Sequence, residues 1–148
     1  MRSIGKVDSA FFIRKPIHQG AFTVDQYPLK NSAILDSATT IHIFNEITRF
    51  VNFRTADPGD FVWAGEHRVP IQGYGIVDIR INNPKGPKIL RLHEVALCRN
   101  FASNLVSLRQ LHKRGLWWDN RPGNNHLRRK DFSTVAILED HHDQFVLE

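Results

Sequence analysis

From residue 33 onward, short runs rich in β-branched and aromatic residues alternate with glycine, proline, aspartate and asparagine. Runs of this kind form strands, and the residues between them form turns. The runs span residues 33–35, 61–63, 67–71, 75–81 and 89–96. Several short strands at this spacing favour a small barrel or sandwich. We therefore expect a mainly β fold, a small closed or partly open β-barrel with one short helix and further strands near the C-terminus.

The pattern also predicts one hairpin and one helix. Residues 76–81 alternate between apolar and polar side chains, and residues 82–87 supply the asparagine, proline and glycine of a turn. Gly115 stands where a helix commonly ends. One helical face would be shared by Leu105, Leu108, Leu111 and His112. We expect the hairpin to turn within 82–87 and the helix to end before Gly115.

The two ends of the chain differ from this central part. Residues 1–31 show no sustained period and contain scattered charge, proline and glycine, so they indicate an irregular arm or linker. Residues 115–148 contain a second, smaller set of strand-like runs. These runs are either a domain cut short or the closing strands of the same fold.

Length and composition favour one soluble intracellular domain. The 148 residues suffice for a core without disulfides, and the single cysteine, Cys98, lies in an apolar run typical of a buried, inert thiol. The apolar patch at 10–13 is too short for a signal peptide or a membrane span. We expect a cytoplasmic protein that is not secreted, contacts no membrane and needs no cofactor.

One carboxylate, Asp36, follows the apolar run 33–35 directly in the stretch SAILDSATTIHI. Aspartic proteases need two carboxyl groups in contact that share one proton. Asp8 begins a second Asp-Ser-Ala tripeptide, but it lies only 28 positions before Asp36 and follows no apolar strand. One chain therefore supplies one carboxylate, and an active protease would have to be a homodimer.

Residues 36–43 resemble the Asp-Ser-Gly-Ala-Thr-x-His-Ile motif of the retropepsin-like protease segment in copia-type LTR retrotransposon Gag-Pol polyproteins. Further blocks of that segment resemble residues 61–71, 73–79, 104–108 and 115–119, in the same order. The resemblance implies a retropepsin-like barrel over 32–114. It also implies that 115–148 is the start of a pre-integrase segment.

The resemblance also implies roles for individual residues. Asp36 would be the catalytic aspartate, with Ser37 and Thr40 as its hydrogen-bonding neighbours. Gly73, Tyr74 and Gly75 would lie in a flap-like hairpin over the substrate. Active-site support would come from Ala38, Leu105, Val106 and Ser107. The implied partners are a second copy of the chain and polyprotein substrate peptides, and the implied location is a virus-like particle.

The sequence departs from the motif at Ala38, where the family has glycine. Glycine can adopt positive φ and lets the facing carboxylate approach the backbone, whereas a Cβ restricts that conformation and adds a methyl group. We expect weakened or absent catalysis. The alternative is a non-catalytic β-barrel interaction module of the same kind of polyprotein, with nucleic acid as a candidate partner.

Residues 99–130 carry eight lysines and arginines against one acid. A solvated basic face is the simpler interpretation. The sharper one is a nucleic-acid contact at Arg128, Arg129 and Lys130, with Trp117 and Trp118 stacking on bases.

One single histidine and one histidine pair are candidates for acid-base or metal-binding roles. His42 lies near Asp36, but a loop histidine is a better interpretation than an acid-base partner. His141 and His142 lie among acidic residues, which favours an exposed turn over a metal centre, so we expect no metal site.

Overall fold

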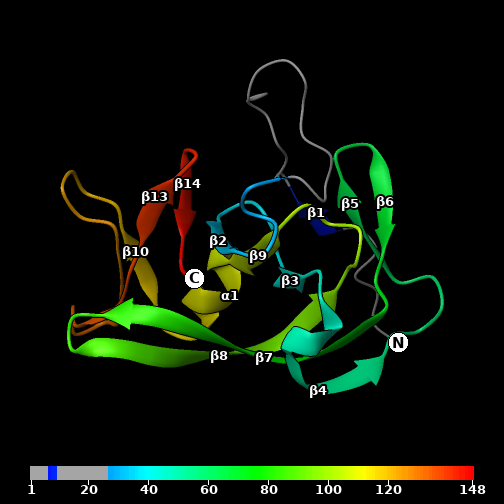
Figure 1. Cartoon of the computed structure of the whole chain (residues 1–148), viewed down its shortest axis with the longest axis horizontal. Helices are drawn as coiled ribbons and strands as arrows, with labels where there is room; N and C mark the ends of the chain where they lie inside the picture. Colours follow the sequence, from blue (N-terminus) through cyan, green and yellow to red (C-terminus); the bar gives the residue numbers. More distant parts are fainter. Residues whose placement is uncertain (1–6, 10–26) are drawn as a thin grey trace.

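The computed structural model describes residues 7–9 and 27–148 of the chain. Within them the fold is mainly β, with one short α-helix (Figure 1). The sheets do not close on themselves. The predicted fold class, a partly open β-barrel with one short helix and strands near the C-terminus, is therefore confirmed.

The strands form one large sheet and two small ones. In spatial order, the eight-stranded sheet contains β13 (Glu139–His141), β14 (Gln144–Val146), β2 (Ala33–Asp36), β9 (Asn104–Ser107), β3 (Ile43–Phe44), β8 (Gly86–Leu97), β7 (Gly73–Asn83) and β4 (Phe50–Thr55). One small sheet contains β1 (Val7–Ser9), β5 (Phe61–Ala64) and β6 (His67–Pro70), and the other contains β10 (Trp117–Asp119), β11 (His126–Arg128) and β12 (Thr134–Ile137). The helices within residues 27–148 are η2 (Ile47–Arg49), a 3-10 turn, and α1 (Leu108–Lys113).

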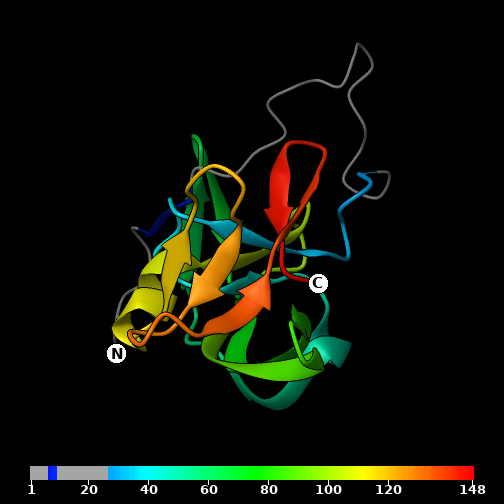
Figure 2. The ribbon, with the colours of Figure 1, turned by 90° about the vertical axis from the view of Figure 1, so that its left-hand side faces the viewer.

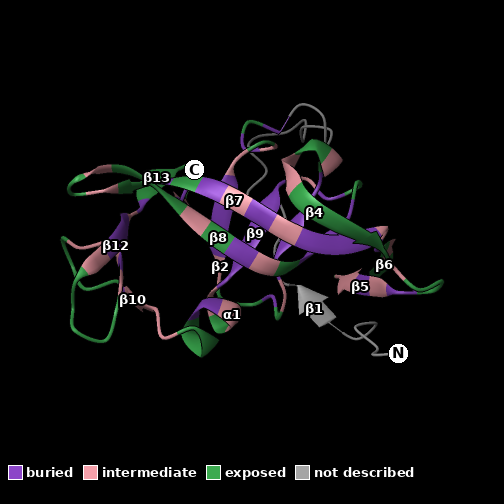
Figure 3. Ribbon diagram, turned by 90° about the horizontal axis from the view of Figure 1, so that it is seen from below, coloured by how far each residue is buried: buried purple, intermediate pink, exposed green. Residues whose placement is uncertain are grey.

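The longest element is the predicted β7–β8 hairpin, which crosses the molecule (Figure 1). Val77, Ile79 and Ile81 are buried, while the residues between them are partly or fully exposed, as the alternation predicts. Figure 3 shows this change of burial along the strand. Asn83 pairs with Gly86 across the turn, and Gly86 has φ 111°, which glycine adopts readily.

Strand β9 lies between β2 and β3, parallel to β2 and antiparallel to β3. Because β2 and β3 are consecutive, the loop that joins them, residues 37–42, has to cross the end of β9. The central strands are buried on both faces: Leu35 and Val106 join one apolar cluster, and Ile34 and Leu105 join the other. This arrangement places the end of β2 in the middle of the fold.

The α1 helix is shorter than the predicted one. Leu105 was expected on its apolar face but lies in β9, because the first helical residue is Leu108. The predicted end is confirmed: Gly115 has φ 83°, its N–H donates to the His112 carbonyl at 2.9 Å, and the Leu116 N–H donates to the Leu111 carbonyl at 3.0 Å. These two bonds form the Schellman ending of a helix.

The C-terminal strands share a core with the barrel. Val146 of β14 pairs with Ile34 of β2, and β13 continues the same sheet. Leu127, Val135 and Leu147 belong to the same apolar cluster as the β7–β8 hairpin. Figure 2 shows the C-terminal strands beside the rest of the barrel. Of the two alternatives for 115–148, the structure therefore favours closing strands of one fold.

The predicted arm, residues 1–31, is described only in part. Val7–Ser9 form β1, which pairs in parallel with β5. Tyr27 and Leu29 are buried in the apolar cluster that also contains Ile34. The rest of the predicted arm lies outside the described residues.

Candidate functional site

Asp36 is the last residue of β2 and follows three buried residues. Its Oδ1 accepts a hydrogen bond from the Ala38 N–H at 2.8 Å. Its Oδ2 is buried and has no hydrogen-bond partner among the described residues. Burial raises the pKa of this carboxyl group, and the backbone N–H groups of Ala38 and Thr39 oppose the rise only in part. Asp36 thus has the one buried, unpartnered carboxylate oxygen in the part of the chain that the structure describes.

The loop after Asp36 is held by β9 and the start of α1. The Ser107 hydroxyl donates to the Thr39 carbonyl at 2.8 Å, and the Gln110 side-chain amide donates to the Thr40 carbonyl at 2.8 Å. In the strand register, Ser107 lies opposite Asp36 itself. The loop is therefore anchored to an element about 70 residues later in the sequence, and the backbone beside the carboxylate is fixed.

His42 ends this loop as a buried structural residue. Its Nδ1 accepts a hydrogen bond from the Ser107 N–H at 2.9 Å. Burial, with smaller contributions from Arg114 and His93, lowers the pKa of His42 to about 3. The ring is therefore neutral at physiological pH and carries its proton on Nε2. The interpretation of His42 as a loop histidine agrees with this geometry.

The resemblance implies that Ser37 and Thr40 form hydrogen bonds with Asp36, and the structure of the single chain differs from this expectation. Both residues are exposed, and the hydrogen bonds to Asp36 within the described residues come from the backbone of Ala38 and Thr39. The buried hydroxyl is that of Thr39, whose Oγ1 donates to the Ile41 carbonyl at 2.9 Å. The predicted bonds from Ser37 and Thr40 are thus absent from the described contacts of the single chain.

Sequence reasoning overlooked Gln110, although a signal was present. Ser107 and Gln110 have the Ser-x-x-Gln spacing of a helix capping box. The Ser107 Oγ does accept from the Gln110 N–H at 3.2 Å. The second bond of the box is replaced, because His42 accepts the Ser107 N–H and leaves the Gln110 side chain to bind Thr40.

Ala38 lies on the exposed side of this loop. Among the described residues, the non-glycine positions with positive φ are Glu94, Phe132, His142 and Asp143. Ala38 therefore has an ordinary backbone conformation, and the expected conflict with a positive φ at this position is wrong. What Ala38 adds is an exposed methyl group, two residues beyond the carboxylate.

The predicted supporting segment does lie beside Asp36. Leu105 and Val106 are fully buried in β9, on opposite faces of the sheet, and Ser107 is buried at its end. Each pairs in parallel with a residue of β2. The pairing with this apolar strand thus fixes the position of Asp36 at the end of β2.

Gly73, Tyr74 and Gly75 do not form a flap. They begin β7 and are buried. All three pair with β4 on one side and with β8 on the other. A Cβ on Gly75 would lie 1.8 Å from the Asn52 carbonyl oxygen, so glycine is needed for close strand packing. The Tyr74 hydroxyl donates to Asp60 Oδ2 at 2.6 Å. The predicted position in a flap-like hairpin is therefore not seen in the single chain, because these residues lie inside a sheet, between β4 and β8.

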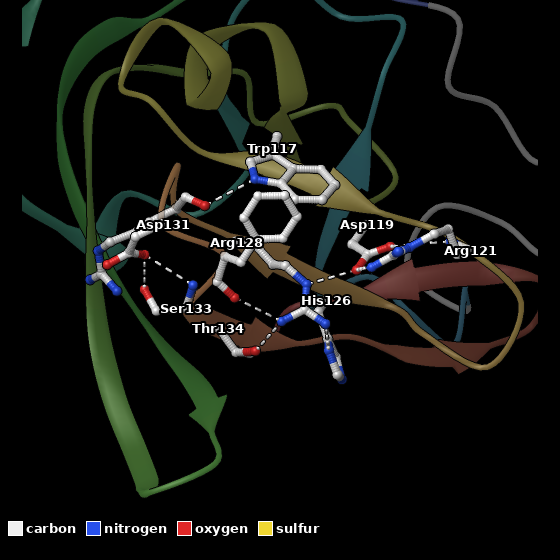
Figure 4. A network of polar contacts seen from close by, with 10 residues as sticks. Trp117, Asp119, Arg121, His126, Arg128, Asp131, Ser133 and Thr134 are labelled. Carbon is white, nitrogen blue, oxygen red and sulfur yellow. Dashed lines mark hydrogen bonds and ion pairs between the residues drawn. The ribbon is translucent and has the colours of Figure 1, made fainter.

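A second polar cluster surrounds Asp119 on β10 (Figure 4). The Arg121 Nε donates to Asp119 Oδ1 at 2.8 Å, and the Arg128 Nε donates to Asp119 Oδ2 at 2.7 Å. The side chain of Asp119 is 0% exposed and that of Arg128 is 15% exposed. The two guanidinium groups hold the pKa of this carboxyl group well below its usual range. The cluster has a buried carboxylate, one largely buried guanidinium and one exposed guanidinium, and it joins β10 to β11.

The cluster corrects part of the predicted nucleic-acid contact. Besides Asp119, Arg128 binds the Thr134 hydroxyl at 2.7 Å and the Phe132 carbonyl at 3.1 Å, so its charge and donors are already used within the fold. Arg129 and Lys130 are exposed in the following turn. Arg128 is therefore engaged within the fold, and the exposed pair is the part of the predicted contact that stays open to a ligand.

The two tryptophans are packing residues. The Trp117 Nε1–H donates to the Arg129 carbonyl at 3.0 Å, and the ring meets Phe132 edge to face at 5.3 Å. Trp118 meets Phe145 in a similar way at 5.1 Å. Both indoles are partly buried by these contacts, which fits packing better than base stacking.

The histidine pair lies in the exposed β13–β14 hairpin. His142 and Asp143 form its turn with φ 53° and 63°, and the His141 ring lies 2.8 Å from Glu139. The described residues contain no group of three or more potential metal ligands. They also contain no helix that is long and apolar enough to cross a membrane. Cys98 is buried, and burial raises the pKa of its thiol.

No curated protein and no solved structure matches this chain. The family model described as Pol polyprotein, beta-barrel domain matches residues 33–116, which is more than half of the chain. The match runs from the first residue of β2 through β9 and α1, so it includes the whole Asp36 loop and its supports. The chain therefore belongs to the Pol polyprotein beta-barrel domain family and is a piece of a retroelement Pol polyprotein.

Proposed function

We propose that this chain is a retropepsin-like aspartic protease domain of a copia-type retrotransposon, active as a homodimer and weakened by Ala38. The observation that carries the proposal is the state of Asp36. Its Oδ2 is buried without a hydrogen-bond partner among the described residues, and burial raises the pKa of the carboxyl group. A carboxyl group that resists ionisation is what a shared-proton pair requires.

The chemistry needs two such groups. When two carboxyl groups face each other, one stays protonated because like charges at this distance cannot both ionise. The ionised partner takes a proton from water, which attacks the peptide carbonyl, while the protonated partner donates to the carbonyl oxygen. Asp36 would take either role, depending on which copy holds the proton.

The second carboxyl group would come from an identical loop. The loop that follows Asp36 exposes Ser37, Ala38 and Thr40 in the single chain. This surface is therefore accessible to a second copy of the chain. A twofold axis through such a surface brings each residue toward its own counterpart. The Ala38 methyl group would then lie near the facing carboxyl group, where a small displacement is costly to catalysis.

The substrates, by this proposal, are peptide segments of the polyprotein itself. The proposal extends to a location in the cytoplasm or in a virus-like particle, and to residues 115–148 as the start of a pre-integrase segment. Residues 115–148 share one apolar core with the barrel. Under this proposal they belong to the next segment of the polyprotein and also complete the fold of this one.

A cleavage assay tests this function. The full chain, Ala38→Gly and Asp36→Asn are incubated at mildly acidic pH with a broad peptide library, and products are identified by mass spectrometry. We expect weak cleavage by the full chain, a gain of about tenfold or more in Ala38→Gly, and none in Asp36→Asn. Pepstatin should inhibit the first two. Equal, pepstatin-insensitive product levels in all three proteins would overturn the proposal.

Ala38 also favours a second candidate, a non-catalytic β-barrel interaction module. The motif glycine is replaced on the exposed side of the loop, directly beside the site. A module of this kind would keep its fold and its partners without hydrolysis. It is supported if Ala38→Gly dimerises in sedimentation experiments but still cleaves no peptide.

A further inference from the structure

A groove of about 590 Å³ lies between the tip of the β7–β8 hairpin and the turn that joins β11 to β12. Its two walls are tied together by Asn83, whose side-chain amide donates to the carbonyl oxygens of Thr134 and Val135, at 3.0 Å each. The groove is therefore built by fixed backbone. It lies on the opposite end of the β7–β8 hairpin from Gly73–Gly75.

The charge on the groove is positive. Lys85, Lys88 and Arg129 line it, and no aspartate or glutamate does. Within the described residues, the two lysines form no ion pair. Asp131, in the turn beside Arg129, accepts from the Ser133 hydroxyl at 2.6 Å and the Ser133 N–H at 3.0 Å. Its pKa is lowered mainly by these two bonds and slightly by Arg129. The groove thus presents two lysines without an ion pair among the described residues, together with Arg129, which interacts weakly with Asp131.

Apolar groups are exposed beside these cations. Ile89 lines the groove and is 63% exposed, and Phe132, in the turn between Arg129 and Ser133, is 62% exposed. Phe132 has φ 68°, an unusual conformation for a bulky residue. Its ring meets Trp117 edge to face and is otherwise largely exposed, so the structure keeps an aromatic surface open to solvent at a cost in backbone energy.

We propose that this groove binds single-stranded nucleic acid, with Lys85, Lys88 and Arg129 on the phosphates and Phe132 stacked on a base. Cations along a groove together with an exposed aromatic ring are the features of sequence-tolerant single-strand binding. An acidic peptide would use the cations but has no planar base for the ring. The site differs from the predicted contact through Arg128 and does not depend on proteolysis, because no residue of the Asp36 loop lines the groove.

Fluorescence anisotropy of the full chain tests the phosphate contacts. The probe is fluorescein-labelled oligouridine of about twelve nucleotides, with a labelled polyglutamate of equal length as the competing class. Replacing Lys85, Lys88 and Arg129 together by glutamine should weaken oligouridine binding about tenfold or more and reduce the salt slope by roughly two. The matched control removes three exposed charges elsewhere, at Arg99, Arg109 and Lys113, and should change binding less than twofold or so.

The aromatic contact has its own variant. Phe132→Asn removes the ring, while asparagine tolerates positive φ better than most residues. It should weaken oligouridine binding about fivefold or more without changing the salt slope. The proposal is overturned if the two triple variants lose equal affinity, if Phe132→Asn binds like the full chain, if polyglutamate binds more tightly than oligouridine, or if the full chain binds no oligouridine at low salt.

Discussion

At the scale of single residues, the carboxyl group of Asp36 lowers the stability of the fold at neutral pH. Its Oδ2 is buried without a hydrogen-bond partner among the described residues, so the folded chain favours the protonated form. The folded pKa is raised above the ordinary value of 3.8. The contribution of Asp36 to stability is therefore greatest below 3.8 and falls as pH rises from there through the folded pKa. A group that serves catalysis at the expense of stability behaves in this way.

Asp36→Asn should therefore stabilise the chain at neutral pH. Asparagine keeps an oxygen to accept the Ala38 N–H but has no charge to bury. The urea midpoint should rise at neutral pH and equal that of the full chain below 3.8. A midpoint that is lower at neutral pH, or equal throughout, would mean that the carboxylate is not strained by burial.

His42 should make the chain sensitive to acid. Its pKa is 6.5 in the unfolded chain and about 3 in the folded one, so protons favour unfolding between these values. Stability should fall by up to about 1.4 kcal/mol for each pH unit below 6.5 through this group. His42→Asn, which keeps an acceptor for the Ser107 N–H, should remove that slope in urea titrations, whereas the exposed His112→Asn should retain it.

Asp119 should matter more for stability than its exposed partner. Removing the carboxylate by Asp119→Asn leaves the Arg128 guanidinium, 15% exposed, without its ionic partner, whereas the Arg121 side chain is 64% exposed. The urea midpoint at neutral pH should fall much further in Asp119→Asn than in Arg121→Gln. Because the Asp119 pKa is depressed, its contribution is present above an ordinary aspartate pKa of 3.8 and is lost as pH falls below it. Equal effects of the two variants would show that the cluster acts as a surface pair.

At the scale of elements, close packing of β4 on β7 depends on missing side chains. A Cβ on Gly75 would lie 1.8 Å from the Asn52 carbonyl oxygen and 2.8 Å from its carbon. Backbone atoms cannot move away as a flexible side chain could, so the strands would have to separate. This also explains why the Gly-Tyr-Gly sequence lies inside a sheet and not at its edge.

Gly75→Ala should cost about 2–3 kcal/mol or more of unfolding free energy in urea. Gly65→Ala is the matched control, because nothing lies within 4 Å of its added Cβ and only its φ of 64° opposes the change. The control should cost about 1 kcal/mol. Similar losses in the two variants would contradict the close approach of β4 and β7.

Short sequence patterns predicted the elements whose formation depends mainly on neighbouring residues. Alternation along 76–81, the turn residues before Gly86 and the glycine after α1 each placed an element correctly. The spacing of apolar residues places Leu105 on the helix, although it lies in β9. A buried strand and a buried helical face both require apolar residues, and spacing alone does not distinguish the two. The pairing of β9 with β2 resolves the choice, and it is formed across about 70 residues.

The candidate site was predictable only in outline. Asp36 and its supporting strand could be inferred because the motif lies directly in the sequence. The role of Arg128 could not, since its bond to Asp119 depends on the antiparallel pairing of β10 with β11. The backbone conformation of Ala38 likewise depends on bonds that Ser107 and Gln110 make to the neighbouring loop residues.

At the scale of the whole molecule, the C-terminal strands and the barrel should unfold together. Leu127, Val135 and Leu147 share an apolar cluster with Val77 of the long hairpin, and β14 pairs with β2. Tryptophan fluorescence of a Trp63→Phe variant, which reports on Trp117 and Trp118 of the C-terminal strand β10, and far-UV circular dichroism should give the same urea midpoint. Two separated transitions would indicate that 115–148 is an independent unit.

The dependence of catalysis on two copies of Asp36 is the central claim. It is tested most directly by mixing Ala38→Gly with increasing amounts of Ala38→Gly that also carries Asp36→Asn, at constant total concentration, and measuring peptide cleavage. With equal parts of each, random pairing leaves about one quarter of the dimers with both carboxyl groups. We predict that the rate falls to that fraction. A fall to about one half, as for catalysis by single chains, or the lack of any cleavage that depends on Asp36 would contradict the claim.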